Sequence, residues 1–135
     1  MDETTPKHVL IVDDDKFLLD MYSIKFAEQG FTVEIASDGA EALEKVNAGL
    51  DLDIYLIDIL MPKMDGFELI GKLREKKINE RATIIILSNL GQQTDIDRGL
   101  NLGVDGYIVK ATATPSEVVA KTIDIANSKK PANHS

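Results

Sequence analysis

Five short apolar runs recur along the chain, and a longer amphipathic stretch follows each of them. The runs are residues 9–12, 32–36, 54–57, 84–87 and 107–109. They are short and rich in Val, Ile and Leu, which is typical of strands that are buried on both faces of a parallel sheet. The pattern therefore predicts five parallel strands.

The stretches after these runs carry apolar residues at spacings of three and four, which predicts helices. We expect them over residues 16–29, 39–48, 66–77, 92–102 and 115–127. The first is expected to pack through Leu18, Met21, Tyr22 and Phe26, and the fourth through Ile96, Leu100 and Leu102.

Residues that favour helix ends support these boundaries. Gly30 follows the first helix, where a left-handed cap residue is expected. Thr114 and Glu117, with Pro115 between them, predict a capping box that starts the last helix.

Five alternating strand and helix units predict an α/β fold, a three-layer α/β/α sandwich around a five-stranded parallel sheet. We expect one domain over residues 7–127, a flexible N-terminus over 1–6 and a flexible C-terminal tail over 128–135. Ligands of such sheets bind at the carboxyl ends of the strands.

The composition removes several classes of function. Among its 135 residues the chain has no Cys and two His, which argues against thiolate sites, Ser-His-Asp triads and multi-histidine metal sites. The net charge of −8 disfavours nonspecific nucleic-acid and anionic membrane binding. No apolar run approaches the roughly 18 residues of a membrane span, and the N-terminus lacks the layout of a signal peptide. We expect a cytoplasmic protein.

The chemistry is expected from polar residues that directly follow the apolar runs. They are Asp13, Asp14 and Asp15 after the first run, Asp58 after the third, Ser88 after the fourth and Lys110 after the fifth. Close carboxylates repel by about 4 kcal/mol per pair at moderate dielectric, so the cluster needs a cation. Mg²⁺ suits a few carboxylates, water and a phosphate oxygen. A Lys and a hydroxyl beside it make a cradle for a phosphoryl group, which a carboxylate can attack.

Together these residues resemble the receiver domain of two-component response regulators. The resemblance is carried by Val12-Asp13-Asp14, by residues 58–66 (Asp-Ile-Leu-Met-Pro-Lys-Met-Asp-Gly), by Leu87-Ser88 and by residues 106–110 (Gly-Tyr-Ile-Val-Lys). It covers residues 7–127 and implies the flavodoxin-like strand order 2-1-3-4-5.

The resemblance also implies a role for each matching residue. Asp58 is the phosphoacceptor and a metal ligand, Asp14 binds Mg²⁺ directly, Asp13 assists through water, and the carbonyl of Leu60 is a further ligand. Ser88 hydrogen-bonds the phosphoryl group and moves on activation, Lys110 pairs with that group, and Tyr107 turns inward as the aromatic switch.

The implied function is that of a single-domain response regulator. It would take a phosphoryl group from a phosphohistidine on a histidine kinase or a phosphotransfer protein, and would catalyse only its own phosphorylation and dephosphorylation. We expect output through protein contacts of residues 92–127 rather than through nucleic acid, and a monomer whose dimerisation on phosphorylation stays open.

Three other interpretations remain. Asp15 is expected to cap the first helix, and capping is an alternative role for Asp13 and Asp14 as well. A haloacid-dehalogenase-type phosphatase also places Asp-x-Asp after a first strand, but Phe17 stands where its motif has Thr or Val. A receiver-like scaffold that works without phosphorylation is the third.

The sequence departs from the family pattern at three positions. Ala111 follows Lys110 where Pro is common, Asn89 follows Ser88 where a small residue is common, and Leu60 is apolar where amide or acidic residues occur. Because a cis bond before a non-proline residue costs about 2.5–4 kcal/mol, we expect the Lys110–Ala111 bond to be trans.

Overall fold

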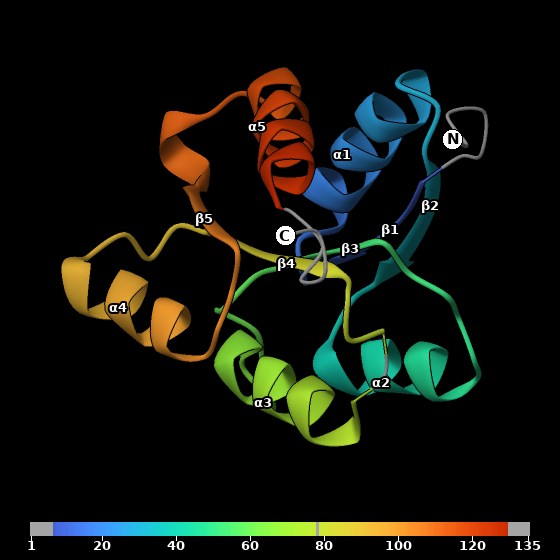
Figure 1. Cartoon of the computed structure of the whole chain (residues 1–135). Helices are drawn as coiled ribbons and strands as arrows, with labels where there is room; N and C mark the ends of the chain where they lie inside the picture. The colour runs from blue at the N-terminus through green and yellow to red at the C-terminus, as the bar shows by residue number, and fades with distance from the viewer. Residues whose placement is uncertain (1–6, 78, 130–135) are drawn as a thin grey trace.

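A computed structural model describes residues 7–77 and 79–129 and shows one five-stranded parallel sheet (Figure 1). The strand order is β2-β1-β3-β4-β5, as the family resemblance implied. The strands are β1 (His8–Val12), β2 (Thr32–Ala36), β3 (Ile54–Ile57), β4 (Thr83–Ser88) and β5 (Gly106–Val109). The five predicted runs are therefore the five strands.

Helices cover both faces of the sheet, which confirms the three-layer prediction. They are α1 (Lys16–Glu28), α2 (Gly39–Asn47), α3 (Gly66–Lys76), α4 (Gln93–Asn101) and α5 (Pro115–Ser128), with a short 3₁₀ helix, η1 (Lys110–Thr112), after β5. Figure 1 shows α1 and α5 on one face, and α2, α3 and α4 on the other. Across the described residues, every helix is too short or too polar to span a bilayer.

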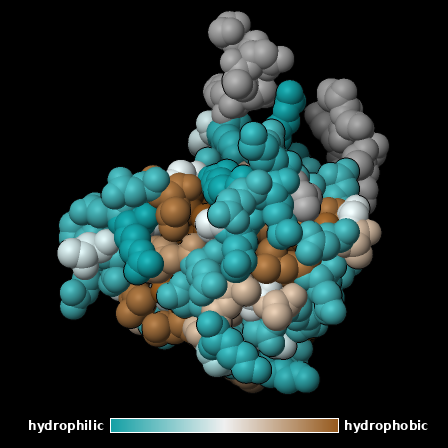
Figure 2. Space-filling view, turned by 90° about the horizontal axis from the view of Figure 1, so that it is seen from below, coloured by the Kyte–Doolittle hydropathy of each residue, from teal (hydrophilic) through white to brown (hydrophobic). Residues whose placement is uncertain are grey.

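The core consists of two hydrophobic clusters, one on each side of the sheet. Alternate residues of one strand supply both: Leu10 and Val12 of β1 enter the cluster under α2 and α3, whereas Val9 and Ile11 enter the cluster under α1 and α5. This two-sided burial explains the continuous apolar runs of β1, β3 and β4. The edge strands β2 and β5 are buried at one residue each and are otherwise half-buried or exposed, so the prediction of burial on both faces was wrong for them. The face seen from below is mostly hydrophilic, with small hydrophobic areas between polar side chains (Figure 2).

The helix starts follow the predicted capping signals. The hydroxyl oxygen of Thr114 accepts the N–H of Glu117 at 3.2 Å, and the Glu117 carboxylate accepts the N–H of Thr114 at 2.8 Å. Asp15 accepts the N–H of Leu18 at 3.2 Å, so it is the N-cap of α1. Gly30 after α1 has φ +88°, as expected for a left-handed residue.

The predicted packing faces of two helices were partly wrong. In α1 Tyr22 and Phe26 are buried as predicted and Leu18 packs against the core, but Leu19 is buried and Met21 is only half-buried. In α4 Leu100 is 54% exposed and Gly99 is buried in its place. A periodicity argument places large apolar residues inward and has no means of predicting that a glycine makes the contact.

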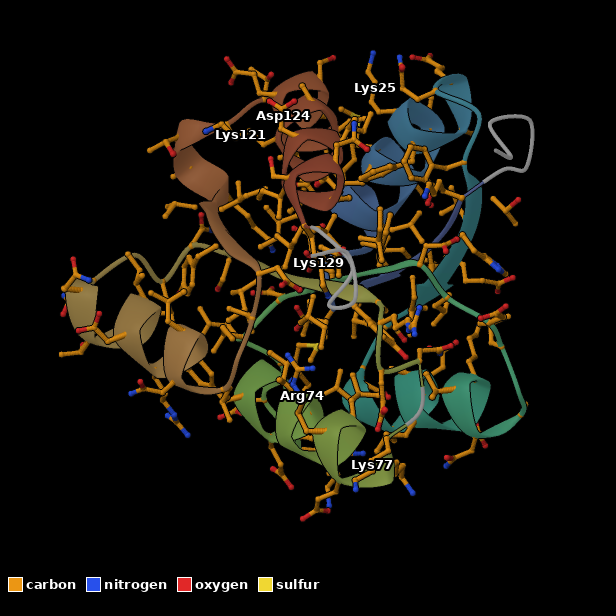
Figure 3. The ribbon with its side chains drawn as sticks, in the orientation of Figure 1. Lys25, Arg74, Lys77, Lys121, Asp124 and Lys129 are labelled. Atoms are coloured by element: carbon orange, nitrogen blue, oxygen red, sulfur yellow. The ribbon has the colours of Figure 1, made fainter. Side chains whose placement is uncertain are left out.

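The predicted flexible ends lie largely outside the described residues. This holds for residues 1–6 and 130–135. Ser128, placed in the predicted tail, is the last residue of α5, and Lys129 follows it (labelled in Figure 3). The Lys129 ammonium donates to the carbonyl of Ala82 at 2.9 Å and pairs with Asp105 at 3.2 Å.

Candidate functional site

Three carboxylates meet at the carboxyl edge of the sheet because β1 and β3 are parallel neighbours. Asp13 and Asp14 follow β1, Asp58 follows β3, and the N–H of Asp58 donates to the Val12 carbonyl at 2.9 Å. One oxygen of each carboxylate lies within 4.8 Å of the others. Asp13 and Asp58 are buried, at 1% and 4% exposure, and Asp14 is exposed. The sequence prediction of an acidic pocket is met by this geometry.

Lys110, the first residue of η1, reaches two of these carboxylates. Its ammonium nitrogen lies 2.6 Å from Oδ2 of Asp13 and 2.9 Å from Oδ2 of Asp58, with only 9% of the side chain exposed. Burial by itself lowers the pKa of Lys110, but its close contacts with the two carboxylates outweigh burial and raise that pKa. The lysine is therefore a fixed positive charge between two strand ends.

For Asp13, burial changes the pKa more than the contacts with neighbouring groups do. It raises the pKa of the Asp13 carboxyl, and the contacts with Lys110 and with the N–H of Asp15 only partly offset it. An ionised Asp13 in this position is costly and would be stabilised by further positive charge.

The backbone around the acidic pocket donates to the same carboxylates. Oδ1 of Asp58 accepts the N–H of Leu60 at 3.2 Å, and Oδ1 of Asp13 accepts the N–H of Asp15 at 2.9 Å. These bonds fix the rotamers of both side chains. Of the three aspartates in sequence, Asp15 caps α1, so the capping alternative accounts for that residue alone.

Gly66 lets α3 start directly against the end of β3, next to Asp58. Its N–H donates to the Ile59 carbonyl at 3.0 Å, and a Cβ at this position would lie 2.3 Å from the carbonyl oxygen of Asp58. In the sequence, the Asp65-Gly66 pair indicates a turn and belongs to the family motif, but it does not reveal this contact. The physical reason for the glycine is the close approach of two backbones.

Ser88 and Tyr107 are linked through the loop between β4 and α4. Ser88 is fully buried at the end of β4, and its hydroxyl oxygen accepts the N–H of Leu90 at 3.4 Å. The hydroxyl of Tyr107 donates to the carbonyl of Leu90. The switch roles that the resemblance gives to these residues stay predictions. Their common contact with Leu90 could not be predicted from the sequence. No spacing pattern indicates that the backbone of the loop after β4 contacts a tyrosine of β5.

The donor set fits Mg²⁺. Three carboxylates and one ammonium leave a formal charge of −2 when all four groups are ionised, which matches one divalent cation. Hard oxygen donors are the ligands that Mg²⁺ prefers, and the exposure of Asp14 gives room for the waters it retains. The Leu60 carbonyl follows Asp58 by two residues and stays a predicted ligand.

Comparison with known proteins identifies the family. Residues 9–122 match the family model described as response regulator receiver domain. The chain belongs to this family. Receiver domains are parts of two-component systems, and family membership argues against the haloacid-dehalogenase alternative.

Two curated relatives match this chain over only part of their own length. Response regulator SaeR of Staphylococcus epidermidis is 33% identical over 128 residues, which are 95% of this chain and 54% of that protein. The gliding motility regulatory protein of Myxococcus xanthus is 40% identical over 116 residues, 86% of this chain and 15% of that protein. The chain thus spans about half the length of the first relative.

Solved receiver structures match nearly end to end. Chemotaxis protein CheY4 of Vibrio cholerae has a TM-score of 0.83 at 28% identity, covering 90% of this chain and 99% of that one. The receiver domain of Francisella response regulator 1452 has a TM-score of 0.80 at 34% identity, covering 92% and 99%. These matches agree with the observed strand order.

Proposed function

We propose that this receiver domain accepts a phosphoryl group on Asp58 from a phosphohistidine of a sensor histidine kinase or a histidine phosphotransfer protein. The observation that carries the proposal is the position of the Lys110 ammonium between Asp13 and Asp58, at 2.6 and 2.9 Å. A lysine held there places positive charge where an incoming phosphoryl oxygen would develop negative charge.

The transfer forms one bond to phosphorus and breaks another. A carboxylate oxygen of Asp58 forms a bond to phosphorus while the phosphorus–nitrogen bond of the donor breaks, and the imidazole leaves with the electron pair. Asp13, Asp14, Asp58 and the Leu60 carbonyl would hold Mg²⁺, which supplies Lewis-acid charge to the phosphoryl oxygens when bound. Lys110 would pair with those oxygens, and the Ser88 hydroxyl would donate to one of them.

Output would follow from the link through Leu90. If Ser88 turns toward a phosphoryl group, its hydroxyl releases the N–H of Leu90. The loop at Leu90 is then free to move, and the carbonyl of Leu90 is the group to which the Tyr107 hydroxyl donates. The signal would then pass to the surface of α4, β5 and α5 and to a protein partner. In this proposal the domain acts in signalling in the cytoplasm and acts chemically only on its own aspartate.

The test uses acetyl phosphate and Mg²⁺ as donor and cation. We expect one acid-labile phosphoryl group per chain, located at Asp58 by mass spectrometry, and none in Asp58→Asn. Asp51→Asn, an exposed aspartate before β3, is the matched control and should label like the wild type.

Two results would overturn the proposal. Labelling that persists at another residue in Asp58→Asn would contradict the assignment of the acceptor. A folded wild type that takes no phosphoryl group would favour the scaffold interpretation instead.

A further inference from the structure

The helix α4 is held to the molecule differently from the other helices. Of its residues, all of which the structure describes, Gly99 alone is buried, whereas α3 buries four large apolar side chains, namely Phe67, Leu69, Ile70 and Leu73. A Cβ at Gly99 would lie 2.7 Å from Cδ1 of Ile86, so the α4 backbone rests directly on the sheet. Because α4 buries so little apolar side-chain surface, polar contacts at its two ends contribute a larger share of the energy that holds it in place.

The C-terminal end of α4 is bound by an arginine of α3. The Nε of Arg74 donates to the carbonyl of Leu102 at 3.2 Å, and its Nη2 donates to the carbonyl of Gly103 at 2.5 Å. The last carbonyls of a helix lack partners within the helix and carry its negative dipole end, so a guanidinium with two donors suits them. Figure 3 labels Arg74 on α3, next to the connection from α4 to β5.

A second arginine joins the same two helices. The guanidinium carbon of Arg98, in α4, lies 4.2 Å from the centre of the Phe67 ring, in α3. Since α3 begins at Gly66, against the carbonyl of Asp58, the helix that binds α4 is itself fixed to the phosphoacceptor strand.

The N-terminal end of α4 depends on other residues. The loop that leads into it is held at Leu90 by the hydroxyl of Tyr107 and by Ser88, and neither contact involves α3. One end of α4 is thus attached to the candidate switch residues and the other end to Arg74.

We propose that Arg74 is a pivot that keeps the C-terminal end of α4 in place, so that phosphorylation of Asp58 moves only its N-terminal end. This inference rests on the proposed function. Arg74 acts here as a positioning residue, because it touches neither the phosphoryl group nor the carboxylates. Without it, the whole of α4 would loosen and the change would no longer be confined to one end.

Amide hydrogen exchange of the full chain, measured by NMR or mass spectrometry, tests the pivot. Each protein is measured alone and with Mg²⁺ and beryllofluoride, which mimics a bound phosphoryl group. In the wild type we expect faster exchange at the N-terminal amides of Ile96 and Asp97 with the mimic, and unchanged exchange at Leu102, Gly103 and Val104.

The variant Arg74→Met removes the donors and keeps much of the stem. We expect exchange at Leu102, Gly103 and Val104 to be about tenfold faster or more even without the mimic, because hydrogen bonds to a charged donor are lost. The control Lys76→Met removes one charge from the exposed side of the same helix and should behave as the wild type. Arg74→Lys keeps the charge without the two-donor fork and should be intermediate.

The two proposals fail in different ways. If Asp58 is phosphorylated and Arg74→Met exchanges like Lys76→Met at these three amides, the pivot is wrong and the proposed function stands. If the wild type takes no phosphoryl group and α4 does not respond to the mimic, the proposed function fails and the pivot falls with it. A circular dichroism melt of each variant shows whether global unfolding accounts for any faster exchange, which would also count against a local role.

Discussion

At the scale of single residues, the site depends on charges that are buried together. Asp13 and Asp58 are almost inaccessible, and Lys110 compensates both of them. Removing one member of such a group leaves an uncompensated buried charge, which costs more than the intact pair gains. Substitutions of uncharged residues around the site avoid this cost.

Leu60 and Leu90 are such residues, and we predict that they lengthen the life of the phosphorylated state. Hydrolysis needs a water held in line with phosphorus by a polar neighbour, and neither leucine can orient or deprotonate one. Leu60 is 53% exposed on the loop after Asp58, and Leu90 is half-buried on the loop after β4. In Leu60→Asn with Leu90→Glu we expect decay roughly tenfold faster, below the full effect of a positioned general base.

A time course of the acyl phosphate after removal of the donor measures this rate. Leu100→Asn, an equally exposed leucine on α4, is the control and should decay as the wild type does. Decay of the double variant at the wild-type rate would show that these two side chains do not control the lifetime.

At the scale of elements, the sequence predicted most of the fold because local signals agreed with it. Strands buried on both faces leave continuous apolar runs, and the cap residues Asp15 and Thr114 mark helix starts independently of packing. The predicted trans bond at Lys110–Ala111 is also confirmed, since all described peptide bonds are trans.

The misses at this scale involve contacts that the sequence does not encode locally. Leu100 points outward because Gly99 brings the α4 backbone against Ile86. The Arg74 contact with Leu102 and Gly103 joins residues 28 and 29 positions apart, and only the folded chain brings them together. Of the candidate site, the strand-end residues were predictable, whereas the Leu90 link between Ser88 and Tyr107 was not.

The start of α3 provides a prediction about an element. In Gly66→Ala the new methyl group would lie 2.3 Å from the Asp58 carbonyl oxygen, so α3 or the segment after β3 must shift. We expect a loss of about 1–3 kcal/mol in the free energy of unfolding and slower labelling of Asp58.

Gly71 in the same helix is the matched control. A Cβ there would meet nothing within 4 Å, so Gly71→Ala should raise the free energy of unfolding by about 0.5–1 kcal/mol through helix propensity. Urea unfolding of both variants measures the two effects. Equal stability of the two variants would contradict the close approach at Gly66.

At the scale of the whole molecule, the charges are distributed unevenly. Three carboxylates gather at the carboxyl edge of the sheet, while α3 starts at that edge and ends in Arg74 and Lys76, at the opposite edge. Lys77, its C-cap, is labelled at that end in Figure 3. With a net charge of −8, the repulsion at the acidic edge is a cost of folding that a cation bound only by the folded state would relieve.

The melting temperature should therefore rise with Mg²⁺ even without a phosphoryl group. A cation at about ten times its dissociation constant stabilises the folded state by roughly 1.4 kcal/mol, which is about 5 °C for a domain of this size. Asp14→Asn should abolish the gain, because Asp14 is the exposed carboxylate of the cluster, whereas Asp13 and Asp58 are the two that pair with Lys110. Asp20→Asn, an exposed aspartate of α1 outside the cluster, should keep it.

The melts are compared in MgCl₂ and in NaCl of equal ionic strength, so that screening of the whole acidic surface is the same in both. If the wild type melts at one temperature in the two salts, or if Asp14→Asn gains as much as Asp20→Asn, the three carboxylates do not form a magnesium site.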